Sequence, residues 1–170
     1  MSKKHLGLII QILIYVLAIA VNVLIVVSSC LNGFKSTNQS SWVVNLLSSI
    51  LNFFNKNAVT EANKDQFAHV VRKLIGHYGL FLLSGCFTSL SIYFLFSKKK
   101  WFNITYFSLM SLLFGAFLAI LTECIQLNVP GRSGQFSDVL IDFSGYLTSF
   151  LIIFIVLYFY LKNRDTSKEE

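Results

Sequence analysis

Proline and acidic residues are scarce in this chain of 170 residues. It holds one proline and eight Asp and Glu residues, against 14 Lys and Arg residues, so its net charge is +6. Only 13% of the residues are charged, whereas 55% are hydrophobic, and the mean hydropathy is +0.65. These proportions exclude an ordinary soluble domain and leave no room for a separate one beside the apolar stretches.

Cysteine is also rare, and its positions predict no covalent or metal framework. Cys30, Cys86 and Cys124 are odd in number and lack the spacing of a metal-binding motif. The chain contains neither a P-loop nor a dinucleotide-binding fingerprint. We therefore expect no cofactor.

Long apolar stretches dominate what is present. Each reaches the roughly 20 residues that a helix needs to cross a hydrocarbon layer about 30 Å thick. Backbone polar groups in lipid must be satisfied within their own segment, which favours helices. The sequence predicts one all-α membrane domain over residues 1–170, with four transmembrane helices at residues 6–29, 78–96, 104–127 and 139–161.

The basic residues predict how these helices are oriented. With four crossings, the short segments on one side carry a dense set of cations: Lys3, Lys4, Lys98, Lys99, Lys100, Lys162, Arg164 and Lys168. Cytoplasmic loops carry such an excess, so we expect both termini in the cytoplasm. The cations then contact anionic membrane lipids, and no nucleic-acid partner is expected.

The first apolar stretch ends in Val27-Ser28-Ser29-Cys30, which is similar to a bacterial lipoprotein cleavage site. Its apolar run is much longer than the roughly 7–15 residues of a signal-peptide core. We expect an uncleaved helix.

The segment at residues 30–68 is expected outside the cytoplasm. Its first part, residues 31–41, is polar and predicted to be a loop, after which Ser40 or Ser41 caps a helix over residues 42–55. Apolar residues recur there at helical spacing, yet the stretch is too short and too polar to span. It fits an interfacial or re-entrant helix, or equally a cover packed on the other helices.

Ionisable residues gather near the outer ends of the last three spans. His69, Lys73 and His77 follow one another at intervals of four, so a helix places them on one face, with Arg72 beside them. Near the next outer end stand Glu123 and Gln126, followed by a turn that contains Pro130, Gly131, Arg132 and Gly134. Asp138 and Asp142 then open the last helix.

Two interpretations of this cluster stay open. In the structural one, Arg132 bridges Glu123 and Asp138, while Arg72 and Lys73 meet Asp142 or lipid phosphates. In the functional one, the arginines hold an anionic head group bidentately, and His77 or Glu123 transfers a proton. Ionisable residues at membrane depth are by default candidates for function. Glu123, Asp138, Asp142 and His77 are suitable metal ligands, but without a compact motif we predict no metal site.

Three segments carry a family resemblance. They are Val71-Arg72-Lys73-Leu-Ile-Gly-His77, then Thr122-Glu123-Cys-Ile-Gln126-Leu-Asn-Val-Pro130-Gly131-Arg132, and Asp138-Val-Leu-Ile-Asp142-Phe-Ser-Gly145. Together they resemble the VanZ-like family over the second to fourth spans. Many relatives carry an acid three residues after the histidine, where this chain has Leu80.

The resemblance implies a multi-pass protein of the bacterial plasma membrane that contributes to resistance to lipoglycopeptides of the teicoplanin type. The family's motif residues carry over here as Arg72, Lys73, His77, Glu123, Gln126, Arg132, Asp138 and Asp142, with no reaction attached to them. From the chemistry of the side chains, we take His77 and Glu123 as catalytic candidates and the other six as substrate-binding candidates. We expect this polar cluster to engage an anionic envelope lipid, a lipid-linked cell-wall precursor or the drug. The alternatives are an enzyme that modifies a lipid-linked envelope substrate, and a small transporter or scaffold subunit. The oligomeric state is not defined by the sequence.

Overall fold

The computed structural model describes residues 3–100 and 102–166. Over these residues the protein is helical and has no strand. Four helices are long and apolar enough to cross a membrane: His5–Cys30, Lys64–Phe96, Ile104–Leu127 and Phe136–Lys162. The prediction of an all-α, multi-pass membrane protein with four spans is therefore confirmed.

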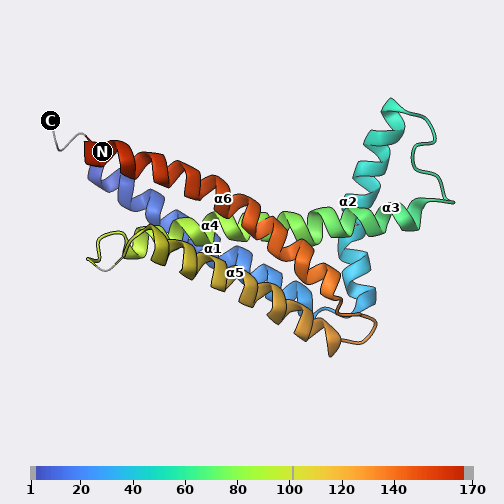
Figure 1. The fold of residues 1–170 in the computed structure, drawn as a ribbon. Helices are drawn as coiled ribbons and strands as arrows, with labels where there is room; N and C mark the ends of the chain where they lie inside the picture. The colour runs from blue at the N-terminus through green and yellow to red at the C-terminus, as the bar shows by residue number, and fades with distance from the viewer. Residues whose placement is uncertain (1–2, 101, 167–170) are drawn as a thin grey trace.

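The spanning helices form an elongated bundle, and both termini lie at the same end of it (Figure 1). At the other end, α2 and α3 project beyond the bundle (Figure 1). The helices are α1 (Lys3–Cys30), α2 (Gly33–Phe54), α3 (Lys64–Val71), the π-helix η1 (Arg72–Gly79), α4 (Leu80–Phe96), α5 (Ile104–Leu127) and α6 (Phe136–Thr166). Because α3, η1 and α4 are continuous, they make one helical span.

Local sequence signals explain where α5 begins and ends. The side chain of Asn103 accepts hydrogen bonds from the backbone N–H groups of Thr105 and Tyr106, both at 3.0 Å, and so caps the helix. After Leu127 the chain turns through Gly131, whose φ of 73° favours glycine. This turn carries the chain directly into α6.

The core of the bundle is aromatic and closely packed. The rings of Phe107 on α5 and Phe150 on α6 are stacked with centroids 5.7 Å apart. Glycines bring α6 close to the second span, because a Cβ at Gly85 or Gly145 would overlap backbone of the facing helix. Small residues at such contacts are typical of membrane helices, whose association depends on close packing.

Hydrogen bonds join α1 to α4 in the middle of the bundle. The amide of Asn22 donates to the Thr88 hydroxyl at 3.0 Å, and the Ser84 hydroxyl donates back to the Asn22 side-chain oxygen at 2.7 Å. Such bonds contribute on average about 0.6 kcal/mol each in membrane proteins. They fix the register of α1, whose outer face is largely exposed.

The helix between the first two spans is longer than predicted. It begins at Gly33, so the predicted loop at residues 31–41 is wrong, and Ser40 and Ser41 lie inside the helix instead of capping it. Polar residues lower helix propensity by only a few tenths of a kcal/mol each, so a polar composition alone does not exclude a helix. The loop that follows is held by Asn52, which exchanges two hydrogen bonds with the Val59 backbone, both at 2.9 Å.

Candidate functional site

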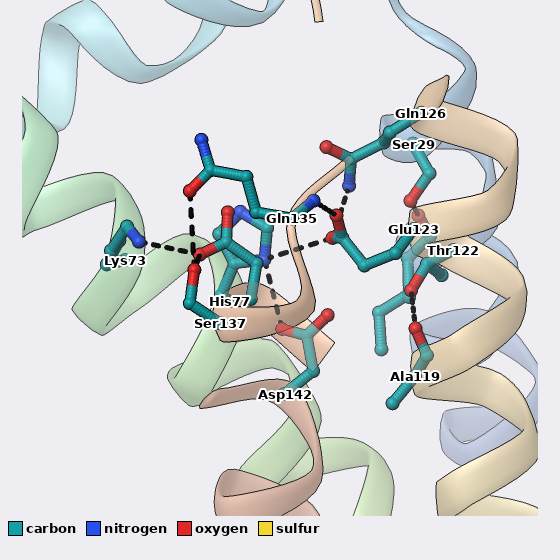
Figure 2. Close-up of polar contacts among 12 residues, drawn as sticks. Ser29, Lys73, His77, Ala119, Thr122, Glu123, Gln126, Gln135, Ser137 and Asp142 are labelled. Atoms are coloured by element: carbon teal, nitrogen blue, oxygen red, sulfur yellow. Dashed lines mark hydrogen bonds and ion pairs between the residues drawn. The ribbon is translucent and has the colours of Figure 1, made fainter. Parts of the chain in front are cut away.

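A π-helical segment carries the basic residues of the second span. Residues Arg72–Gly79 form η1, in which backbone hydrogen bonds run from i to i+5 and widen the turns. Such segments are rare and occur frequently at functional sites. Lys73 and His77 of η1 both reach toward residues of α6 (Figure 2).

These two side chains pair with two acids of α6. The ammonium of Lys73 lies 2.6 Å from Asp138 Oδ1, and Nδ1 of His77 lies 3.0 Å from Asp142 Oδ1. The helices run in the same direction from this end of the bundle (Figure 1), so an interval of four on one matches an interval of four on the other. Gly145, one turn further along, lies against the Tyr78 carbonyl oxygen and permits this close approach.

Glu123 of α5 completes the cluster from a third span. It is 4% exposed, and its Oε1 accepts a hydrogen bond from the Gln126 amide at 3.0 Å. Its Oε2 accepts a hydrogen bond from the backbone N–H of Gln135 at 3.0 Å. The same Oε1 lies 3.9 Å from His77 Nδ1, so the imidazole stands between the carboxylates of Glu123 and Asp142 (Figure 2).

Arg132 lies in the turn between α5 and α6. Its Nε donates to the side-chain oxygen of Gln126 at 3.1 Å. Burial lowers the pKa of Arg132, whereas Glu123 and Asp138 act in the opposite direction. The guanidinium stays charged, because the ordinary pKa of arginine lies far above neutrality.

A cavity of about 280 Å³ opens beside this cluster. Its polar lining includes Arg72, His77, Gln126, Arg132 and Asp142. Its apolar lining comes from α1, α2 and the second span, and includes Leu24, Ile25, Trp42, Val43 and Phe81. The site therefore offers cationic and hydrogen-bonding groups next to an apolar wall.

The structure brings most of the predicted site residues together. Four of the predicted substrate-binding residues line the cavity, whereas Lys73 and Asp138 pair with each other. Of the two catalytic candidates, His77 lines the cavity. Glu123 does not line it, but it accepts a hydrogen bond from Gln126, which does. His69, which helical spacing placed on the same face, is exposed on α3.

Sequence reasoning missed several members of the site. Gln135 acts through its backbone N–H, which leaves no trace in the choice of side chain. The Ser137 hydroxyl lies 3.3 Å from Asp138 Oδ1, and only its position next to an acid would have indicated this contact. The apolar wall from α1 and α2 depends on how distant segments pack, which no local pattern reveals.

Two kinds of chemistry are compatible with this arrangement. Arginine forks bind phosphate and carboxylate groups bidentately, and an apolar wall accommodates a hydrocarbon chain. An imidazole held by a carboxylate is the usual arrangement of a general base. Leu80, three residues after His77 on the second span, offers no carboxylate, and Asp142 of another helix provides one for His77.

The family of the chain is shown by its sequence. The model of the VanZ/LLP1 family matches residues 12–158, and the protein belongs to this family. The family name is associated with teicoplanin resistance. Comparison with curated proteins and with solved structures finds no match.

Proposed function

We propose that this VanZ-family protein binds a phosphate-bearing envelope lipid, or a lipid-linked cell-wall precursor, in the cavity next to its polar cluster. By holding that lipid it lowers the susceptibility of the cell to drugs of the teicoplanin type. The single observation that carries the proposal is the cavity of about 280 Å³ that has two arginines, Arg72 and Arg132, on its polar side and an apolar wall opposite them. An amphiphile with an anionic head group matches both sides.

The cationic side selects the head group. Arg72 and Arg132 come from different segments, so their guanidinium groups reach the cavity from two directions. Guanidinium groups bind phosphate oxygens in pairs, with geometry as well as charge. Gln126 adds an amide to this side and is itself bonded to Glu123 and Arg132. Hydrogen bonds within the protein therefore already position Gln126 and Arg132 before the head group binds.

The apolar side selects the lipid chain. Ile25 of α1 and Phe81 of α4 are almost completely buried, and Val43 of α2 is also part of the lining. Burying apolar carbon here has little driving force from water, because the surroundings are already lipid. The wall therefore contributes shape, and the phosphate contacts contribute most of the selectivity.

The orientation of the site follows from the charges at the other end. Lys98, Lys99 and Lys100 stand in the turn between α4 and α5, at the end where the termini lie (Figure 1). The positive-inside rule places that end in the cytoplasm and the cavity outside it, where cell-wall precursors and the drugs meet. A reporter that fluoresces only in the cytoplasm, fused after residue 170, should be bright, and a dark reporter would overturn this orientation.

The proposal is tested by binding of a prenyl phosphate to the purified full-length protein in lipid nanodiscs. Arg72→Gln and Arg132→Gln should each weaken binding by about 10- to 100-fold, because each removes a charge-assisted hydrogen bond to phosphate. Lysine at either position keeps the charge but loses the fork, so it should restore only part of the affinity. The same variants should lose teicoplanin resistance in growth assays at equal protein levels.

Two controls make the binding result specific. Prenyl alcohol carries the same chain without the phosphate and should bind at least about 10-fold more weakly than the phosphate. Lys98→Gln removes a cation at the opposite end of the bundle and should bind like the unaltered protein. Equal binding of alcohol and phosphate, or unchanged binding by both arginine variants, would refute the proposal. Arginine-dependent binding of teicoplanin without binding of prenyl phosphate would assign the cavity to the drug.

A second candidate function is favoured by the contact between His77 and Asp142. With Nδ1 3.0 Å from the carboxylate, the imidazole is oriented as in a general base, and it lines the cavity. In that case the bound lipid is chemically altered. Mass spectrometry of prenyl phosphate or a lipid-linked precursor after incubation should then show a new product that His77→Ala fails to make. Unchanged lipid after long incubation would leave binding as the function.

A further inference from the structure

Three ligand-type side chains from three spans meet next to the cavity. His77 belongs to η1, Glu123 to α5 and Asp142 to α6, and one ligand atom of each lies within 4.8 Å of the other two. The distance from His77 Nδ1 is 3.0 Å to Asp142 Oδ1 and 3.9 Å to Glu123 Oε1. Figure 2 shows one ring nitrogen of His77 facing the carboxyl groups of both Glu123 and Asp142.

These distances fit ligands of one cation. Nitrogen and carboxylate oxygen bind Zn²⁺ at about 2.0–2.2 Å, so two ligands of one ion lie at most about 4.4 Å apart. Both distances from His77 Nδ1 fall below that limit, and a small side-chain movement brings the two carboxylates within it. Neither a backbone shift nor a new residue is required.

A second observation concerns the carboxylate of Asp142, one oxygen of which has no hydrogen-bond donor in the part of the chain that the structure describes. Asp142 is 1% exposed, and its Oδ2 is buried with no hydrogen-bond partner among the described residues. It stands six residues into α6, about 9 Å below the start of the helix. A buried acceptor left unsatisfied costs about 1–3 kcal/mol, and more when it is charged, so such an atom indicates a missing partner. A metal ion bound to this carboxylate is such a partner.

The charges of the buried acids also favour a bound cation. Glu123 and Asp142 are both buried, and the single imidazole between them supplies at most one positive charge. The ammonium of Lys73 is 2.6 Å from Asp138, and the guanidinium of Arg132, bonded to Gln126, interacts electrostatically with Glu123. Carboxylates removed from water need charge compensation or metal coordination. A divalent cation bound by both carboxylates adds to this compensation and gives Asp142 Oδ2 the partner that it lacks within the described chain.

We infer that His77, Glu123 and Asp142 form a binding site for a divalent transition-metal cation, with Zn²⁺ the best fit. One imidazole and two carboxylates form a borderline-to-hard ligand set that suits Zn²⁺ or Mn²⁺. The cation takes the place of the proton that His77 Nδ1 shares with Asp142. Gln126 and the Gln135 backbone N–H orient the Glu123 carboxylate, as outer partners of metal ligands do.

The site has a side open to the cavity. His77 and Asp142 are part of the cavity lining, so a remaining coordination position faces the space where a head group would lie. With three protein ligands, such a cation keeps a position for water or a phosphate oxygen. The inference does not rest on the proposed function, because the three ligands are present whatever the cavity binds.

The test is a Zn²⁺ titration of the full-length protein, purified without a polyhistidine tag and stripped with a chelator. In competition with a chromophoric chelator, the protein should bind about one Zn²⁺ per chain, and Co²⁺ in its place should give visible absorption bands. Asp142→Asn, Glu123→Gln and His77→Ala should each weaken binding by more than about 100-fold, since even outer-partner changes cost 10- to 100-fold.

Matched variants distinguish binding at this site from nonspecific binding of Zn²⁺ elsewhere on the protein. Asp138→Asn alters an acid one turn away on the same helix, and His69→Ala removes an exposed histidine of the same span, so both should keep the affinity within about threefold. Arg72→Gln should also keep Zn²⁺ binding, even where it abolishes binding of prenyl phosphate. If Asp142→Asn does not fold, Glu123→Gln carries the test, with circular dichroism as the check.

Three outcomes would overturn the inference. The first is that the unaltered protein takes up no Zn²⁺, Mn²⁺ or Co²⁺. The second is that the ligand variants retain full affinity for Zn²⁺. The third is that Asp138→Asn and His69→Ala lose as much Zn²⁺ affinity as the ligand variants. The inference is supported if the ligand variants lose Zn²⁺ binding and the control variants keep it.

Discussion

The two ends of the bundle differ in what their cavities are made of. At the end where the termini lie, a cavity of about 550 Å³ is lined by Tyr93, Phe102, Phe107 and Tyr158, with Lys162 at its edge. At the opposite end, the cavity of about 280 Å³ is smaller, yet its lining includes Arg72, His77, Arg132 and Asp142. The larger cavity has no acid in its lining, whereas the smaller one combines both signs of charge.

The difference shows that volume alone does not identify a site. Aromatic rings fill space and tolerate gaps between α5 and α6, so a large cavity there follows from packing. Ionised groups near membrane depth cost roughly 2.5–3.5 kcal/mol each at a helix centre, so their concentration at one end needs a reason. The polar end is therefore expected to carry function, and the aromatic end stability.

Phe107→Ala should have the largest effect on stability. Phe107 is 1% exposed and stacks on Phe150, and removing such a ring leaves a hole that costs about 3–5 kcal/mol. The affinity of the folded protein for prenyl phosphate should stay unchanged, because the ring lies at the other end. Unfolding in a denaturing detergent, followed by circular dichroism, measures the first effect, and nanodisc binding the second.

Leu113→Ala is the control for that change. Leu113 is 61% exposed on the same helix and faces the surroundings of the bundle, so its truncation should cost less than about 1 kcal/mol. If Phe107→Ala costs no more than this control, or weakens binding by itself, the division between a stabilising end and a functional end is wrong.

Gly145→Ala should have an intermediate effect and should act on both properties. The added methyl group would overlap the Tyr78 carbonyl oxygen and force α6 away from η1, at a cost of about 1–3 kcal/mol. The same separation lengthens the contacts of His77 and Lys73 with their acids, so binding should fall as well. Gly7→Ala is the control, since nothing lies within 4 Å of its new methyl group. Equal stability of the two variants would mean that the close contact is not needed.

Lys162→Gln should have the smallest effect. Lys162 is the cation of the aromatic cavity, and its loss should change the affinity for prenyl phosphate by less than about twofold. A loss comparable to that of Arg72→Gln, in the same nanodisc assay, would move the anion site to the end with the termini.

Much of the fold was predictable because apolar length is a local property. Each span contains a continuous apolar run, which predicts that a span exists there. The second helix nevertheless begins at Lys64, well before its predicted apolar run at residues 78–96. The intervals of four in Lys73 and His77, and in Asp138 and Asp142, are also local, and they predict that each pair lies on one face of its helix. The helix from Gly33 was missed because its first turns lack an apolar pattern.

Spacing alone did not predict which groups would pair. Arg132 was a candidate bridge between Glu123 and Asp138, and in the structure both acids interact with it electrostatically while its Nε donates to Gln126. Asp138 also pairs with Lys73, a partner that spacing did not indicate. The π-helical segment η1 packs against α6, and the sequence of Arg72–Gly79 carries no pattern that predicts its geometry. The proposed cation site also depends on tertiary packing, since one ligand comes from each of three helices and no compact motif exists.

By itself, then, the sequence determined the membrane class, the four spans and the set of ionisable residues at one end, because hydropathy and charge accumulate along the chain. Only the tertiary structure decided that His77 lies between Glu123 and Asp142, and that α1 and α2 supply the apolar wall of the cavity. The physical reason is that these contacts join residues far apart in the chain, through helix packing that glycines such as Gly145 permit.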